Sequence, residues 1–200
     1  MMKRCVVTVA IALFALAGID LRADEWHAGP GVTFVSGTSE VVDRYRANMI
    51  AEGLIADSDK PVPVAVSFDF DYEFTSGLRV GAGVGPFLRL KGSKDHLEMP
   101  INGTLGYVFT PVKNNSPYVK AGLVHHFASG DYYKSSTPGF LGAAGYEFRR
   151  QASFRYAIEV SIDRSKVELD KLCAASDASC QTGTVKVHTF DWAASFYVKF

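Results

Sequence analysis

The segment Phe190-Asp191-Trp192-Ala193-Ala194-Ser195-Phe196-Tyr197-Val198-Lys199-Phe200, at the end of the sequence, decides the predicted fold class. Its even-numbered positions carry Phe, Trp, Ala, Phe, Val and Phe, whereas its odd-numbered positions carry Asp, Ala, Ser, Tyr and Lys. Side chains of a β-strand point alternately to its two faces, so the pattern indicates one apolar and one polar face. Such a strand fits either the edge of a soluble β-sandwich or the wall of a barrel whose outer face meets lipid.

Seven further segments alternate in the same way, and together the eight predict an all-β, antiparallel, up-and-down transmembrane barrel. The expected strands span residues 26–36, 62–74, 78–90, 96–110, 117–127, 139–149, 153–168 and 184–200. The clearest of them, residues 62–74, has one face made of Val66, Phe68, Phe70, Tyr72 and Phe74. Its other face carries Ser67, Asp69, Asp71 and Glu73.

The connections between these strands alternate in length. Those after the first, fifth and seventh strands are long, with loops at residues 37–61, 129–138 and 169–183. Connections after the second, fourth and sixth strands are short, which is the pattern of barrels with short periplasmic turns and longer external loops. One short helix is expected in the first external loop, at residues 39–52. Its apolar face could plug the barrel, lie on the surface or dock a partner, and packing over the barrel is favoured.

Most charged residues of the strands lie opposite the apolar face. A Lys or Arg facing lipid at mid-depth would cost about 2–4 kcal/mol, so these groups are expected inside the barrel or at its rims. Eight strands leave an interior only wide enough for side chains, and Gly81, Gly83 and Gly85 are expected to make room there. This predicts a filled lumen and no wide pore. Aromatic side chains, including those of Phe74 and Tyr118, are expected to collect at one rim as a girdle.

The first residues have the features of an export signal. Lys3 and Arg4 precede an apolar run that ends near Gly18, and residues 15–17 read Ala-Leu-Ala, a typical cleavage site. Residues 1–17 are therefore expected to be removed, with cleavage as late as residue 23 as an alternative, and residues 24–200 to form the barrel domain. Removal takes two of the 21 basic residues and none of the 21 acidic ones, which leaves a net charge of −2. That balance gives no indication of nucleic-acid binding.

Two cysteines remain in the expected mature chain, Cys173 and Cys180. In an oxidising compartment they are expected to close a disulfide across the last long loop, worth about 2–3 kcal/mol by loop-entropy arithmetic. The loop offers too few ligands for a metal site, and no cofactor is expected.

With these features, residues 26–200 resemble the small bacterial outer-membrane β-barrels, the group of OmpX-like proteins and OmpA-like transmembrane domains. The resemblance implies a location in the outer membrane, with its lipid and lipopolysaccharide as surroundings. It also implies that the barrel-assembly machinery recognises the last strand, with Phe196, Val198 and Phe200 as the assembly signal. The external loops are expected to carry any recognition of an extracellular ligand.

One constellation could support catalysis: His126, Ser129 and Asp131 supply the residue types of a hydrolytic triad. Some eight-stranded barrels, the PagL-type lipid A deacylases, use a His-x-Ser spacing, but here His126 and Ser129 are three residues apart. A regular strand places such residues on opposite faces. The expected function is therefore structural or surface interaction, without enzymatic activity. A PagL-like hydrolase and an OmpW-like passage for small apolar solutes remain the alternatives, although the inward charges argue against an apolar passage.

Overall fold

The computed structural model describes residues 23–36, 40–54, 64–90, 94, 96–173, 179–189 and 192–200. The expected export signal at residues 1–17 lies outside these ranges, as do parts of the predicted external loops. Every structural statement below concerns the described residues.

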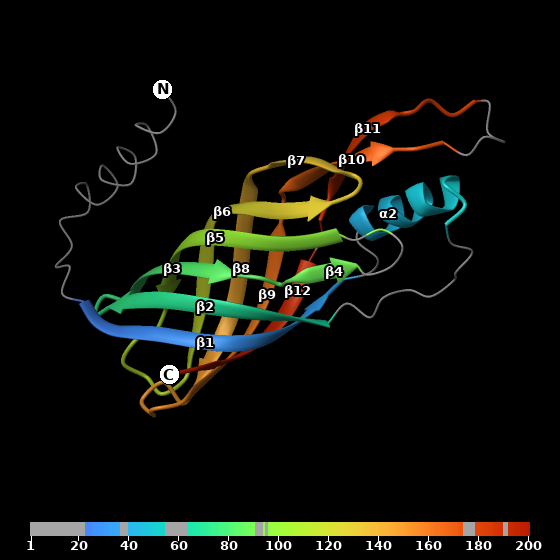
Figure 1. Cartoon of the computed structure of the whole chain (residues 1–200). Helices are drawn as coiled ribbons and strands as arrows, with labels where there is room; N and C mark the ends of the chain where they lie inside the picture. Colours follow the sequence, from blue (N-terminus) through green and yellow to red (C-terminus); the bar gives the residue numbers. More distant parts are fainter. Residues whose placement is uncertain are drawn as a thin grey trace, which may run out of the picture.

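Eight strands form a closed antiparallel barrel (Figure 1). They are β1 (Ala23–Val35), β2 (Val64–Phe74), β3 (Leu78–Val84), β5 (His96–Val108), β6 (Ser116–Gly130), β8 (Gly139–Phe148), β9 (Arg155–Asp163) and β12 (Trp192–Lys199). Each wall strand pairs with its neighbour along the chain, and β12 pairs with β1 to close the cylinder. At the seam, the backbone N–H groups of Ala28 and Phe200 each donate to the other residue's carbonyl, at 3.1 and 3.0 Å. The predicted fold class is confirmed.

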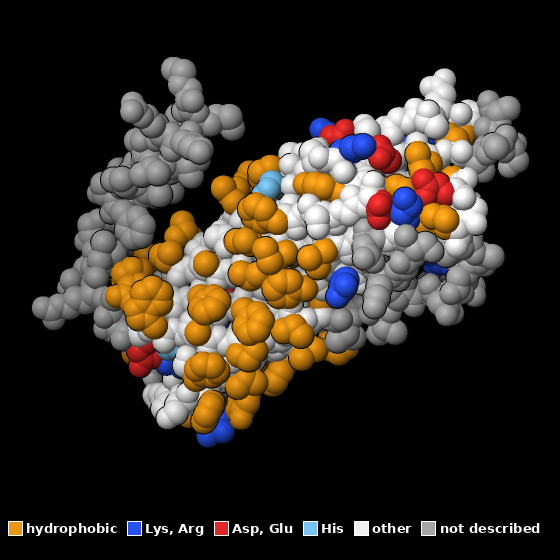
Figure 2. Space-filling model, viewed as in Figure 1, with side chains coloured by type: hydrophobic (Ala, Val, Ile, Leu, Met, Phe, Trp, Pro, Cys, Tyr) orange, Lys and Arg blue, Asp and Glu red, His pale blue; other side chains and the backbone are white. Residues whose placement is uncertain are grey.

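The alternation predicted from the sequence sorts the wall into two environments. Phe68, Phe70 and Ile158 point outward and keep 41, 45 and 51 % of their surface exposed. On the face of the molecule seen in Figure 2, apolar side chains of this kind cover the barrel wall, and most of the charged side chains on that outer surface lie toward the two ends. An apolar belt of this extent would aggregate in water, so it requires a hydrocarbon environment.

The two ends of the barrel differ. At one end, called the turn end, short turns join β2 to β3, β5 to β6 and β8 to β9. The other end extends beyond the wall into a folded unit, called the cap (Figure 1). The cap consists of α2 (Glu40–Ala51) and a three-stranded sheet in the order β11 (Gly183–His188), β10 (Lys166–Lys171) and β7 (Tyr133–Thr137). No helix in the described ranges has the length and apolarity needed to cross a bilayer.

The cap corrects three features of the predicted strand pattern. Residues 129–138 were expected to be a polar loop, but β6 runs on to Gly130 and β7 follows after a turn. The predicted strand at residues 153–168 divides into β9 and β10, because Asp163 Oδ1 accepts hydrogen bonds from both the backbone N–H and the hydroxyl of Ser165, at 2.7 Å each. That local turn redirects the chain from the barrel wall into the cap sheet. The last predicted strand likewise divides into β11 and β12.

The predicted third strand is also interrupted. β3 ends at Val84, and a short β4 (Leu88–Leu90) continues the pairing with β5. Between them, Gly85 has a φ of 98° and Pro86 follows a cis peptide bond. A proline cannot donate to the ladder and a positive φ favours glycine, so the sequence Gly85-Pro86 breaks the strand locally.

The expected aromatic girdle is only partly present. Tyr107, Phe109 and Phe148 lie exposed at the turn end, as predicted. Tyr118, by contrast, is 2 % exposed and faces the lumen, where its hydroxyl donates to Glu159 at 2.8 Å. Its position in the strand alternation places it with Lys120 on the inner face. The prediction that Tyr118 belongs to the girdle is therefore wrong.

Val160→Lys tests the lipid-facing wall. Val160 lies in the middle of β9 and is 51 % exposed, so a lysine there would place its ammonium group in hydrocarbon. We expect the free energy of unfolding in phospholipid vesicles to fall by about 2–4 kcal/mol. Val112→Lys, in a turn where the valine is 81 % exposed, is the matched control and should change it by less than about 0.5 kcal/mol. Equal effects of the two substitutions would contradict a lipid-facing wall.

Candidate functional site

The part of the lumen toward the turn end holds a network of ion pairs. Its members are five carboxylates and five bases: Asp69, Asp71, Glu73, Glu147, Glu159, Arg79, Lys120, Arg150, Arg155 and Lys199. Arg79 donates to Glu73 at 2.7 Å and to both oxygens of Glu147 at 2.8 Å. Each of these charges faces a group of opposite sign, and their inward placement agrees with the prediction from the sequence.

Lys199 shows how completely the network encloses its members. Its ammonium group lies 2.7 Å from Asp69 and 2.6 Å from Asp71, and the residue is 1 % exposed. Lys120, which lies on β6, contacts the same Asp69 at 3.2 Å and Glu159 at 2.8 Å. A buried charge is tolerated when it is paired and hydrogen-bonded, and each of these ammonium groups has at least two carboxylate partners.

The next layer of the lumen, toward the cap, contains a cluster of hydroxyl groups. Thr33 Oγ1 lies 2.8 Å from the hydroxyls of both Ser67 and Ser195, which joins β1, β2 and β12 across the inside of the wall. A cavity of about 30 Å³ adjoins this layer, which is room for a water molecule or two. The described lumen is therefore filled by side chains and contains no wide passage at this level.

The cap end of the lumen is held by His126. Its Nδ1 contacts Glu98 and its Nε2 lies 2.7 Å from Asp163 Oδ2, so the imidazole bridges β5 and β9. His126, Glu98 and Asp163 are all at most 2 % exposed. Both ring nitrogens face carboxylates, and an imidazolium satisfies that arrangement because it donates from both. His96, also buried, lies 3.4 Å from the other oxygen of Glu98.

The structure does not bring the three candidate triad residues together as a triad. Ser129 is exposed on the outer side of β6, whereas His126 faces the lumen, as their spacing predicted. Asp131 lies in the turn after β6, where it pairs with Lys94 at 3.6 Å. His125, the neighbour of His126, is partly exposed and lies 3.3 Å from the hydroxyl of Ser136 in the cap. Within the described residues, no group of three or more His, Cys, Asp and Glu side chains is placed to hold a metal ion.

The cap has an apolar core of its own. Val41 of α2 packs against Val167, Leu169 and Val187 of the cap sheet, and all four are at most 6 % exposed. Asn48 fastens the helix to the sheet: its side chain donates to the carbonyl of Asp170 at 2.6 Å and accepts from the N–H of Leu172 at 3.0 Å. The predicted helix is thus present as Glu40–Ala51, and its apolar face is covered by the cap sheet.

Aromatic contacts connect the cap to the barrel mouth. The ring of Tyr45 on α2 lies 5.5 Å from that of His96 and 4.9 Å from that of Tyr132. Burial, together with donation to Glu52 at 2.7 Å, raises the pKa of the Tyr132 hydroxyl well above its ordinary value. On the cap sheet, hydrogen bonds from Thr184 and Ser135 lower the pKa of the Glu168 carboxyl.

The disulfide predicted from the sequence is present. Cys173 and Cys180 are bonded, with their Cα atoms 5.7 Å apart, in the connection between β10 and β11. The bond closes the tip of a hairpin that packs on α2. It therefore constrains the cap and lies outside the barrel wall.

The residues proposed as an assembly signal form the outer face of β12. Phe196 and Phe200 are 44 and 61 % exposed, and Val198 lies between them on the same face. Their placement agrees with the predicted alternation, while their recognition by an assembly machinery stays a prediction.

Sequence reasoning missed the cap sheet and the partners of His126. The sequence contains a signal for this sheet: apolar and polar residues alternate in residues 166–169 and again in residues 185–188. These two segments lie on either side of the short cysteine loop, which is the pattern of a hairpin. For His126 the signal was weaker. His96 and Glu98 share a strand face, but their proximity to His126 depends on the pairing of β5 with β6.

The closed wall, apolar belt and charge-filled lumen together define a small transmembrane β-barrel of eight strands. Solved outer-membrane barrels have this fold. The chain is similar to the outer membrane protein OprG from Pseudomonas aeruginosa, with a TM-score of 0.52 and 15 % identity over 88 % of this chain and 94 % of that one. It is also similar to Outer Membrane Protein W of E. coli, with a TM-score of 0.51 and 16 % identity over 90 % of this chain and 98 % of that one. No family model and no curated protein matches the sequence.

His126→Ala tests the bridge at the barrel mouth. The substitution leaves Glu98 and Asp163 buried without their shared cation, and breaking a buried ion pair costs about 3–5 kcal/mol. We expect a loss of that size in the free energy of unfolding. His125→Ala, which removes a partly exposed ring with one long hydrogen bond, should cost less than about 1 kcal/mol. A small effect at both positions would show that His126 is not a structural cation.

Cys173→Ser combined with Cys180→Ser tests the independence of the cap. Loss of the cross-link should destabilise the cap by about 2–3 kcal/mol through loop entropy. Limited proteolysis of the solubilised protein is the measurement: cleavage within the cap should accelerate, while the barrel fragment persists. Faster degradation of the barrel itself would contradict the separation of cap and wall.

Proposed function

We propose that the protein is an outer-membrane anchor that presents the cap as a surface-interaction module. One observation carries the proposal: the lumen is filled by paired charges, while the part of the molecule beyond the apolar belt is a folded unit with its own core and a disulfide. A filled lumen does not favour transport of solutes through the barrel. A folded cap is suited to presenting a surface to a partner.

The orientation follows from the two ends. Outer-membrane barrels carry short turns on the periplasmic side and longer elements outside, so the turn end faces the periplasm and the cap faces the exterior. Export by residues 1–17, assembly through Phe196, Val198 and Phe200 and residence among outer-membrane lipid and lipopolysaccharide belong to the same proposal. An extracellular ligand, where there is one, would meet the cap.

The same geometry favours a role without catalysis. A general base needs a free nitrogen near its nucleophile, but the two ring nitrogens of His126 already face Glu98 and Asp163. Ser129 lies on the other face of β6. The hydrolase alternative would therefore need a rearrangement of the barrel mouth. The alternative of an apolar passage would need an inner wall without the ion pairs of Arg79 and Lys199.

Protease treatment of intact cells tests this proposal. Trypsin should cleave after cap lysines such as Lys134 and Lys186, which are exposed, and leave a membrane-embedded barrel. Lys113, exposed in the β5–β6 turn, is the internal control and should be cut only after the outer membrane is permeabilised. Cleavage at Lys113 in intact cells would reverse the orientation.

Conductance and lipid analysis complete the test. The purified protein in a planar bilayer should show no porin-sized conductance, and its expression should leave the lipid A mass spectrum unchanged. A wide conductance would contradict the filled lumen, and deacylated lipid A would replace this proposal with the hydrolase.

A further inference from the structure

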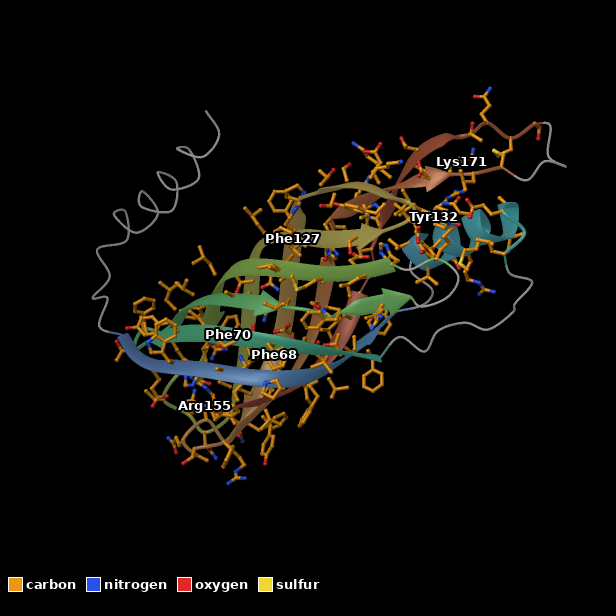
Figure 3. The ribbon with its side chains drawn as sticks, viewed as in Figure 1. Phe68, Phe70, Phe127, Tyr132, Arg155 and Lys171 are labelled. Atoms are coloured by element: carbon orange, nitrogen blue, oxygen red, sulfur yellow. A yellow bond between two sulfur atoms is a disulfide. The ribbon has the colours of Figure 1, made fainter. Side chains whose placement is uncertain are left out.

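A recess of about 360 Å³ opens at the turn end, beneath the ion-pair network. It lies between the start of β1, the β2–β3 turn and the turns that precede β6 and β9. Phe74, Pro111 and Val112 give it an apolar side, while Gln151 and Arg155 give it a polar side. Arg155 lies at this end of the barrel in Figure 3.

The two arginines that line the recess differ in how firmly they are paired. Arg150 is fully engaged by fixed groups: it donates to Glu147 at 3.1 Å, to Glu73, and to the carbonyls of Thr110 and Pro111 at 3.2 and 2.9 Å. These acceptors are backbone atoms or buried carboxylates, so Arg150 is a structural cation.

Arg155 is held differently. It donates to the ring nitrogen Nε2 of His27 at 2.9 Å and to the carboxylate of Glu25, and the buried Glu73 is 3.9 Å away. The side chain of Arg155 is 9 % exposed, whereas that of Glu25 is 57 % exposed. The guanidinium is thus fixed in the wall of the recess, while its nearest carboxylate belongs to a side chain that can turn into solvent.

This contrast indicates an exchangeable counter-ion. A guanidinium pairs with a carboxylate through two parallel hydrogen bonds, and any carboxylate that reaches the recess can offer the same pair. The Glu25 side chain is 57 % exposed, so its carboxylate can be solvated by water when a ligand displaces it from Arg155. A ligand carrying a small apolar group next to its carboxylate would also cover Phe74 and Val112.

We propose that the recess binds the terminal carboxylate of a peptide whose last residue is small and apolar, with Arg155 as its anchor. Glu25 occupies the anchor until the ligand displaces it. That the recess meets periplasmic peptides rests on the orientation proposed above, whereas the binding chemistry is a property of the turn end alone.

Binding to the full-length protein in detergent micelles tests this inference, with N-acetyl-alanyl-alanine as the probe and its C-terminal amide as the matched control. Isothermal titration should show saturable binding of the acid, and binding of the amide at least tenfold weaker. Glu25→Gln removes the competing carboxylate, so it should tighten binding of the acid about fivefold. Arg155→Gln should abolish it, and Val112→Trp, which fills the apolar side, should weaken it.

Several outcomes would overturn the inference. Absence of saturable binding, equal affinity for acid and amide, or unchanged affinity in Glu25→Gln would each do so. Equal competition by acetate would overturn the assignment to a peptide. Glu25 is exposed, so Glu25→Gln keeps the test valid even where Arg155→Gln fails to fold, and Glu168→Gln in the cap should change nothing. Because titration in micelles needs no orientation, failure here and failure of the protease experiment are separate results.

Discussion

The pairing of charges inside the barrel is the constraint on which the rest of the structure depends. Lipid outside the wall leaves the lumen poorly solvated, so each ionised group there must find a partner within the cylinder. Arg79 illustrates the solution, since it contacts carboxylates from two strands far apart in the chain, β2 and β8. The wall can close only in a register that brings these groups together, so charge pairing and strand register support the same arrangement.

Space inside the cylinder is the second condition of that arrangement. A Cβ atom on Gly81 would lie 2.8 Å from Thr104 Oγ1, and one on Gly83 would lie 2.7 Å from the side-chain nitrogen of Asn102. Both glycines face the lumen at levels where polar side chains cross it. Small residues on β3 therefore permit large polar ones on β5, and the filled lumen is a consequence of this division.

Much of the wall could be predicted from the sequence because alternation is local. Each strand shows its two faces in its own residues, as in Phe68 to Phe74, and eight such segments suffice for a barrel. The cap could not be predicted so well, because its strands alternate in the same way as the wall. The apolar positions do change from even to odd between Ile162 and Val167, but the turn at Ser165 depends on the side chain of Asp163.

The site was less predictable than the fold, for the same physical reason. The spacing placed His126 and Ser129 on opposite faces of a strand. The partners of His126 come from β5 and β9, and the register between strands cannot be deduced from one segment alone. The recess at the turn end was harder still to predict, because it is formed by residues that lie far apart in the sequence. Its anchor Arg155 and its counter-ion Glu25 are separated by 130 residues and meet only because the barrel closes.

The reversal of the hydrophobic pattern between β9 and β10 locates the boundary between lipid and water. In β9 the apolar Ile158, Val160 and Ile162 face outward, exposed on the wall. Past Ser165 the apolar Val167 and Leu169 are fully buried under α2, while polar side chains face out. One continuous stretch of chain thus changes from a surface suited to hydrocarbon to one suited to water within a few residues. The buried bridge of His126 and Asp163 lies at that level. The buried charges at the barrel mouth are therefore enclosed at the height where the surroundings of the barrel change from lipid to water.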